Sequence, residues 1–133
     1  MQKGDIQFVV EDTIFNYRVV VLLNTPDGYI FEKSSDGFLF TVGGKASINE
    51  NSSDTIKREL MEEIGLKCTD LKLVALIENF FVWPSEGGKY HELSLVYRVN
   101  IDISLKLSEL KSSNPRNMGF VAIKPEDFNS VVI

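Results

Sequence analysis

One run near the middle of the chain constrains the molecule more than any other feature. It reads GKASINENSSDTIKRELMEEIGL, from Gly44 to Leu66. Glycine and charged residues stand in it at fixed distances: Gly44, then Glu50 after five residues, then Arg58 after seven more. The other fixed positions are Glu59, Glu62, Glu63 and Gly65. With average residue usage, a match of all seven positions arises by chance in roughly one window in 10^8. The run therefore predicts a defined chemical site.

The second half of this run predicts an amphipathic helix. Asn51, Ser52 and Ser53 are candidate N-caps, and Asn51 as the cap places Asp54 in a capping-box position. Apolar residues then recur at every fourth position, which makes one buried stripe, and a glycine follows at the usual helix stop. The stripe and the stop comprise Ile56, Leu60, Ile64 and Gly65.

Three carboxylates project from another side of the same helix. Glu59 precedes Glu62 by three residues and Glu63 by four, so the three share one face. Arg58 stands four residues before Glu62 and is expected to hold the cluster in position. Neighbouring carboxylates repel one another, and a hard cation such as Mg²⁺, or Mn²⁺, removes that cost. An ordinary solvated acidic face is the alternative, and it is disfavoured because the flanking glycine and glutamate stand in register.

With these residues the run resembles the signature of the Nudix hydrolases, with no defining position missing, and the likeness extends from about Tyr17 to Phe128. Nudix hydrolases cleave a nucleoside diphosphate linked to another moiety, by attack of water at phosphorus. The resemblance implies a Mg²⁺-dependent pyrophosphohydrolase whose substrate is an ADP-ribose-like compound or a nucleoside triphosphate. The alternative is a non-catalytic Nudix-like nucleotide-binding or sensor domain, although such domains usually lack a glutamate that this chain keeps.

Composition narrows the class of protein further. We expect residues 1–133 to form a single domain, because this length supports one hydrophobic core. The net charge of −5 argues against a nucleic-acid polymer or an anionic membrane as partner. The single Cys68 excludes an internal disulfide and fits a reducing cytoplasm. The chain has neither a visible signal peptide nor a stretch long enough for a transmembrane helix.

The remaining segments predict an α/β/α sandwich, in which helices flank a mixed β-sheet. Pro26-Asp27-Gly28 is a predicted turn, Gly43-Gly44 a predicted loop start, and residues 125–128 a helical turn. The C-terminal helix usual in the family is expected to be shortened or absent. The sheet face beneath it would then be partly open, which predicts a homodimer unless residues 105–110 form the covering helix. Strands are expected at residues 17–23, 29–33, 38–42, 71–82, 90–101 and 120–123.

Further site residues follow from the resemblance or from residue type. The Gly44 carbonyl is a candidate metal ligand, and Glu50 is expected to anchor its loop or orient a metal-bound water. Arg18 begins a buried strand and needs either a substrate phosphate or an internal ion-pair partner. The other candidates are Glu92 as an extra metal ligand or general base, Gly43 beside the substrate, and Phe81 and Trp83 as rings that stack a base, with Glu32 and Glu78 as weaker acids.

Overall fold

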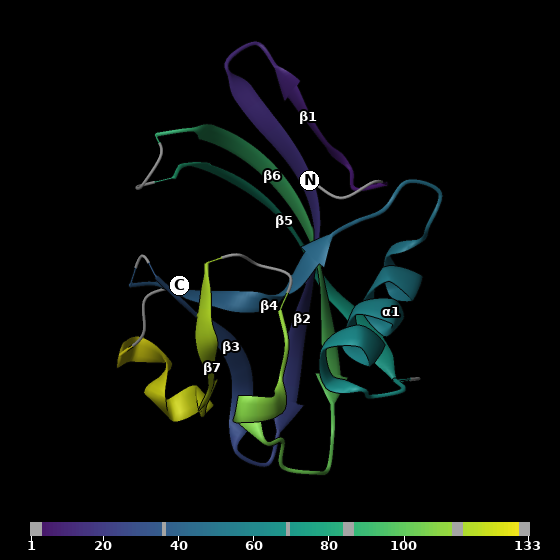
Figure 1. Ribbon diagram of the computed structural model, residues 1–133, viewed down its shortest axis with the longest axis vertical. Helices are drawn as coiled ribbons and strands as arrows, with labels where there is room; N and C mark the ends of the chain where they lie inside the picture. Colours follow the sequence, from purple (N-terminus) through teal and green to yellow (C-terminus); the bar gives the residue numbers. More distant parts are fainter. Residues whose placement is uncertain (1–3, 36, 69, 84–86, 113–115, 131–133) are drawn as a thin grey trace.

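The computed structural model describes residues 4–35, 37–68, 70–83, 87–112 and 116–130. These residues form a seven-stranded sheet with the helix α1 (Ser52–Ile64) packed on one face (Figure 1). The strand order is β5-β6-β2-β4-β3-β7, with β1 also paired to β2, and all pairs are antiparallel except β2 with β6. This confirms the predicted mixed α/β fold. The strands are β1 (Gln7–Val10), β2 (Thr13–Thr25), β3 (Gly28–Ser34), β4 (Leu39–Lys45), β5 (Leu71–Val82), β6 (Lys89–Asn100) and β7 (Asn117–Ile123).

All six predicted strands occur, and β1 is an additional strand that the sequence pattern does not predict. β1 is short and three of its four residues are exposed, so it lacks the alternation of a half-buried strand. It is held by antiparallel pairing with the first residues of β2, where Phe8 lies opposite Phe15. Long-range pairing thus creates this strand, and local propensity does not.

The paired glycines Gly43 and Gly44 lie inside β4, so the prediction that they begin a loop is wrong. They pair with Val20 and Val19 of β2, which continues the sheet to Lys45. A Cβ atom on Gly43 would lie 2.1 Å from the carbonyl oxygen of Val19. Glycine at this position therefore allows the backbones of the two strands to approach closely.

The main core lies between α1 and the sheet. Ile56 and Leu60 of the helix are 0% and 1% exposed, which confirms the predicted apolar stripe, and Ile64 is partly buried against them. Opposite them, β2 contributes alternate residues, as expected for a strand with one face on the core. The strand residues of this core include Val19, Val21, Leu23, Ile30, Val42, Tyr97 and Val99, and Cys68 is buried with them.

The opposite sheet face has a short cover in place of a long helix. The 3₁₀ helix η2 (Pro125–Ser130) places the ring of Phe128 5.8 Å from that of Tyr29 and 6.0 Å from that of Phe31. Residues 131–133, part of the predicted apolar ending, lie outside the described residues. Within residues 105–110 only Leu107–Glu109 form a helix, the 3₁₀ helix η1. These residues do not cover this face, because their three leucines pack against the core beneath α1.

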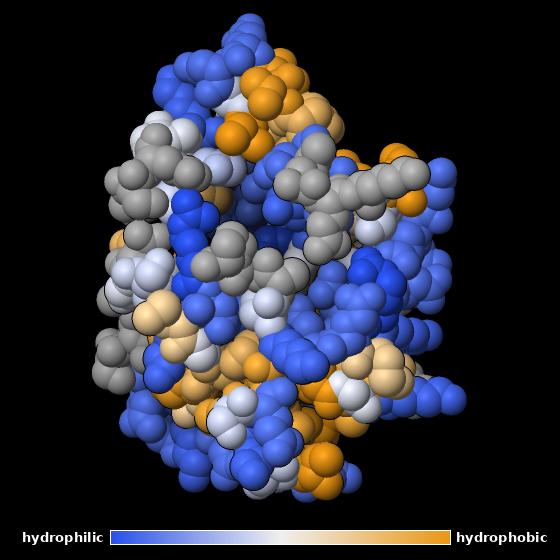
Figure 2. Space-filling view, viewed as in Figure 1, coloured by the Kyte–Doolittle hydropathy of each residue, from blue (hydrophilic) through white to orange (hydrophobic). Residues whose placement is uncertain are grey.

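The tip of the sheet extends beyond α1 (Figure 1). Here the β1–β2 and β5–β6 hairpins expose large apolar side chains, and those of β1 form an orange patch in Figure 2. Phe8, Leu76 and Phe80 are 51%, 65% and 71% exposed. Among the described residues, no helix has the length and apolar character that a membrane crossing requires.

Candidate active site

The ends of α1 are fixed by the residues that the sequence indicates. The Asn51 side chain accepts a hydrogen bond from the Asp54 amide at 3.0 Å, which satisfies a free donor of the first turn. Gly65 adopts a left-handed conformation at φ 67°, and its amide bonds the carbonyl of Met61 at 3.0 Å. These caps fix the start and the end of the helix, and hence the direction in which its glutamates point.

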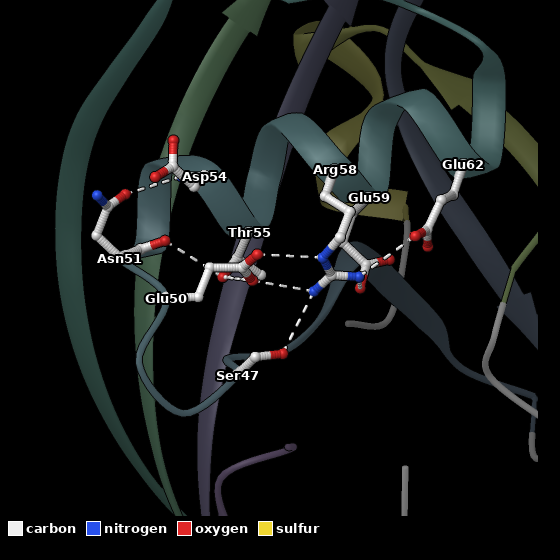
Figure 3. A network of polar contacts seen from close by, with 8 residues as sticks. All are labelled: Ser47, Glu50, Asn51, Asp54, Thr55, Arg58, Glu59 and Glu62. Carbon is white, nitrogen blue, oxygen red and sulfur yellow. Dashed lines mark hydrogen bonds and ion pairs between the residues drawn. The ribbon is translucent and has the colours of Figure 1, made fainter. Parts of the chain in front are cut away.

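Arg58 connects the outer carboxylates of the helix to the preceding loop (Figure 3). Its guanidinium lies 3.1 Å from Glu50, 3.6 Å from Glu59 and 3.5 Å from Glu62. Glu50 also accepts a hydrogen bond from the Thr55 hydroxyl at 2.8 Å. The Arg58 hydrogen bond, with help from Thr55, lowers the pKa of the Glu50 carboxyl. Glu50 is therefore joined to the helix that follows it, as expected for a loop anchor.

Glu63 points inward from the same helix and has a different environment. It is 8% exposed, and its Oε1 atom has no hydrogen-bond partner among the described residues. Burial raises the pKa of its carboxyl to about 9, with smaller contributions from Glu59 and from the charges of Glu32 and Glu62. A buried carboxyl with an unpaired oxygen is costly unless a proton or a cation accompanies it.

Gly44 lies directly against Glu59. A Cβ atom built on Gly44 would stand 2.9 Å from Oε1 of Glu59, so any side chain here would push this carboxylate away. The strand backbone thus reaches the carboxylate cluster at a position where only glycine leaves the space free. Its carbonyl belongs to the same strand segment and is an oxygen donor of the type that hard cations accept.

The donor set fits a divalent cation. Glu59, Glu63 and the backbone of Gly44 supply oxygen donors, and the unpaired Oε1 of Glu63 is a buried acceptor without a donor. In the described part of the chain, no three His, Cys, Asp or Glu side chains already converge closely enough to surround an ion. A bound cation would accordingly require rotation of the flexible glutamate side chains. Carboxylate ligands favour Mg²⁺ or Mn²⁺ over zinc.

An aromatic group stands at the junction of β4, β5 and β6. Trp83 stacks on Phe40 with a centroid distance of 5.4 Å, and the guanidinium carbon of Arg116 lies 4.7 Å from the Trp83 ring centroid. Phe81 stacks on Tyr90 at 5.2 Å and lies 6.2 Å from Trp83. The predicted stacking residues Phe81 and Trp83 are thus neighbours, and each already has an aromatic partner.

Two predicted site residues point away from α1. Arg18 follows Tyr17 and precedes the core residue Val19, so alternation directs it to the opposite sheet face. There it donates to the hydroxyl of Thr41 at 3.1 Å and to its carbonyl at 2.8 Å, and neither is an acid. Glu92 stands beside Asn16 in the parallel β2–β6 register and shares this opposite face. The structure therefore does not bring Arg18 or Glu92 next to the helix carboxylates.

The structure raises the importance of Glu32, which the sequence ranks as a weak candidate, and adds Phe40 and Arg116. Glu32 is 1% exposed in β3 and stands opposite Phe40 in the β3–β4 register. Glu32 follows the apolar residues Ile30 and Phe31 in its strand, and a charged residue that is buried needs a partner. The identity of that partner depends on segments distant in the sequence. Glu78, the other weak candidate, is 66% exposed and lies 3.9 Å from His91.

Comparison with known proteins gives one family match and several solved structures of the same fold. The model of the family described as the NUDIX domain matches residues 14–124. The Mutator MutT protein of Bacillus halodurans is 16% identical over 89% of this chain and 74% of its own, with a TM-score of 0.66. The NUDIX domain of Shewanella oneidensis NrtR, solved with ADP ribose, is 12% identical over 89% and 78%, with a TM-score of 0.63. The dihydroneopterin triphosphate pyrophosphohydrolase of E. coli is 11% identical over 87% and 85%, with a TM-score of 0.62. No curated protein matches by sequence.

Proposed function

The chain belongs to the Nudix family as a Nudix-type hydrolase, and we propose that it is a Mg²⁺-dependent pyrophosphohydrolase. Its substrate is a nucleoside diphosphate linked to another moiety, either an ADP-ribose-like compound or a nucleoside triphosphate. The observation that carries the proposal is the contact of Glu59 with the strand at Gly44, together with the neighbouring buried carboxyl of Glu63. This arrangement offers oxygen donors, and one of the carboxylates has a buried oxygen without a partner.

The residues of the site have distinct proposed tasks. Glu59, Glu62, Glu63 and the Gly44 carbonyl would hold the metal, which would supply neutralisation of phosphate charge and activation of a water. Arg58 positions these carboxylates through its ion pairs, and it keeps the Glu50 loop on the helix. Stabilisation of a developing phosphate charge depends on such pre-positioned groups.

The aromatic group is the proposed site of the nucleobase. Trp83 and Phe81 offer ring faces, and stacking on an aromatic face is worth about 1–3 kcal/mol per base. The Phe40 and Trp83 rings are already stacked on each other, so a base would displace one ring or stack on the outer face of the pair. The Arg116 guanidinium beside Trp83 adds a positive charge, which suits a phosphate.

Arg18, Gly43 and Glu92 remain predictions as substrate-binding or catalytic residues. They lie on the sheet face opposite α1, or between two strands in the case of Gly43. A substrate bound at the helix carboxylates would have to pass around a sheet edge to reach Arg18 or Glu92. We therefore propose that Arg18 and Glu92 contact the substrate only if it is long enough to reach both faces of the sheet.

We also propose that the protein forms a homodimer or self-associates. The support is the exposed apolar surface of the β1–β2 and β5–β6 hairpins, to which Val9 and Val82 contribute 66% and 56% exposed side chains. Burial of apolar surface is worth about 25 cal/mol per Å², so a patch of this kind favours association. Light scattering at high micromolar concentration should give about twice the chain mass, and a mass near 15.0 kDa would exclude the dimer.

The proposed activity is tested by a substrate screen. Purified protein would be incubated with Mg²⁺ and a panel that contains ADP-ribose, dinucleoside compounds and nucleoside triphosphates, with phosphate release measured after phosphatase coupling. We expect hydrolysis of at least one compound, loss of turnover with EDTA, and no turnover by a Glu59→Gln, Glu63→Gln double variant. Tight nucleotide binding by calorimetry without turnover of any compound would favour the non-catalytic alternative.

A further inference from the structure

Glu32 is a buried acid whose hydrogen bonds do not neutralise its charge. It lies in the middle of β3, 1% exposed, with Phe31 beside it in the strand. Its Oε1 atom accepts hydrogen bonds from the Ser112 hydroxyl and from the Asn117 amide, the latter at 2.9 Å. Both donors are neutral. A buried carboxylate is costly unless a positive charge or a proton accompanies it, so these bonds account for its orientation and leave its charge uncompensated.

The backbone brings Glu32 to the C-terminal end of α1. The amide of Lys111 donates to the carbonyl of Glu63 at 3.1 Å, and the next residue, Ser112, bonds Glu32. Two consecutive residues therefore tie the last turn of α1 to β3. Glu32 and Glu63 are each more than 90% buried, and this two-residue link joins them at one end of the site.

No lysine or arginine of the described residues forms an ion pair with either of these two acids. Arg58 pairs with the outer carboxylates Glu50, Glu59 and Glu62 instead. The Oε1 atom of Glu63 also lacks a hydrogen-bond donor among the described residues. These two buried acids would consequently be stabilised by a cation that oxygen ligands bind.

We propose that Glu32 is a further metal ligand, which binds a divalent cation together with Glu63 at the inner end of α1. The proposal rests on the metal dependence proposed above and adds a carboxylate from outside the run Gly44 to Leu66. Glu32 stands opposite Phe40, whose ring stacks on Trp83. A cation held by Glu32 and Glu63 would be near Phe40 and the proposed base site, where it could contact the diphosphate of a bound nucleotide.

The test is a Mn²⁺ titration of metal-free protein, followed through the EPR signal of free Mn²⁺. Glu32→Gln is the main variant, because its amide oxygen can still accept from Ser112 and Asn117. Glu109→Gln is the matched control, since Glu109 is 70% exposed and, among the described residues, forms an ion pair with Lys106 alone. We expect the Kd for Mn²⁺ to rise at least about tenfold in Glu32→Gln, the scale for a disturbed metal site, and to stay unchanged in the control.

Thermal unfolding separates a ligand from a merely structural residue. Without metal, Glu32→Gln should melt at or above the parent temperature, because a buried charge is removed. With Mn²⁺, the parent should gain more in Tm than the variant, because only the parent has the full site. Unchanged Mn²⁺ affinity in Glu32→Gln would overturn the proposal, as would a lower metal-free Tm with an unchanged Mn²⁺-induced shift.

Two further results keep the outcome decisive. If Glu32→Gln fails to fold, Glu32→Asp retains the charge and withdraws the carboxylate by one methylene. Weaker Mn²⁺ binding by Glu32→Asp would then support the proposal, and parent-like binding would overturn it. If the parent hydrolyses nucleotides with Mg²⁺ but Glu32→Gln binds Mn²⁺ as tightly as the parent, only the inference about Glu32 is wrong. A parent that neither binds Mn²⁺ nor hydrolyses any compound removes the proposed function as well.

Discussion

The outer and inner regions of the carboxylate site differ in how their charge is balanced. The outer region consists of Glu50, Glu59 and Glu62, all paired with the guanidinium of Arg58. The inner region consists of Glu63 and Glu32, which are buried and have no cationic partner among the described residues. The same residue type therefore serves two purposes within one site. In the outer region the glutamates hold the loop against the helix through Arg58. In the inner region the glutamates are buried without a positive charge beside them.

The difference has a direct electrostatic consequence. The Arg58 hydrogen bond lowers the pKa of Glu50, whereas burial raises the pKa of Glu63 to about 9. A group that is already paired gains little from an added cation. A buried group without a partner gains much, because the cation replaces both a proton and the lost hydration. We therefore expect metal affinity to come chiefly from the inner region.

The largest expected effect is on catalysis. Glu63→Gln keeps the shape of the side chain and removes an inner ligand charge, so kcat/KM should fall at least about a hundredfold, the scale for loss of a key electrostatic group. Glu62→Gln should lose less, because its side chain is 59% exposed and its charge is screened by water. Initial rates at saturating Mg²⁺ measure both, with Glu109→Gln as control. A larger loss in Glu62→Gln would reverse the comparison.

The next effect is on the pH dependence of stability. Glu63 is protonated in the folded chain up to about pH 9 and ionises near 4.5 when unfolded. Between these values the unfolded state binds fewer protons, so the free energy of unfolding should fall as pH rises, by at most about 1.4 kcal/mol per unit. Glu50 acts with the opposite sign, and its stabilisation is lost as pH falls through the acidic range.

Urea denaturation of metal-free protein, at pH values about one unit apart from pH 3 to pH 9, checks this prediction. Glu63→Gln should lose the decline seen toward alkaline pH, and Glu50→Gln should lose the gain seen on leaving acid. Parallel curves for the parent and Glu63→Gln across the neutral range would show that Glu63 is not held protonated by its surroundings.

The smallest effect is expected for Arg58→Lys. Lysine keeps the charge and loses the planar fork that contacts Glu50 and the two helix glutamates together. Because the Arg58 side chain is 36% exposed, the free energy of unfolding should fall by only about 1 kcal/mol. Activity should fall about tenfold, since the loop and carboxylates lose their shared anchor. Thermal melting and kcat measure the change, with the exposed neighbour Lys57→Arg as control; parent values for both in Arg58→Lys would contradict the prediction.

Much of the helix that carries the site is predictable because its determinants are local. The Asn51 cap, the buried stripe through Ile56 and Leu60, and the Gly65 stop all follow from side-chain type and spacing within a few turns. The pairing of Arg58 with Glu62 follows for the same reason. Hydrogen bonding and periodicity within one helix act between residues close in the chain, so the sequence records them directly.

The tertiary structure decided which acids are buried together. Glu32, Glu63 and Ser112 come from three distant segments, and only the sheet order and the path of residues 107–112 bring them together. The placement of Gly43 in a strand and of Arg18 away from the helix likewise depends on strand pairing. Burial and neighbouring charge are properties of packed surroundings. The type of a residue sets which ligands it can bind. The distant segments that bury it determine whether its charge needs a bound partner.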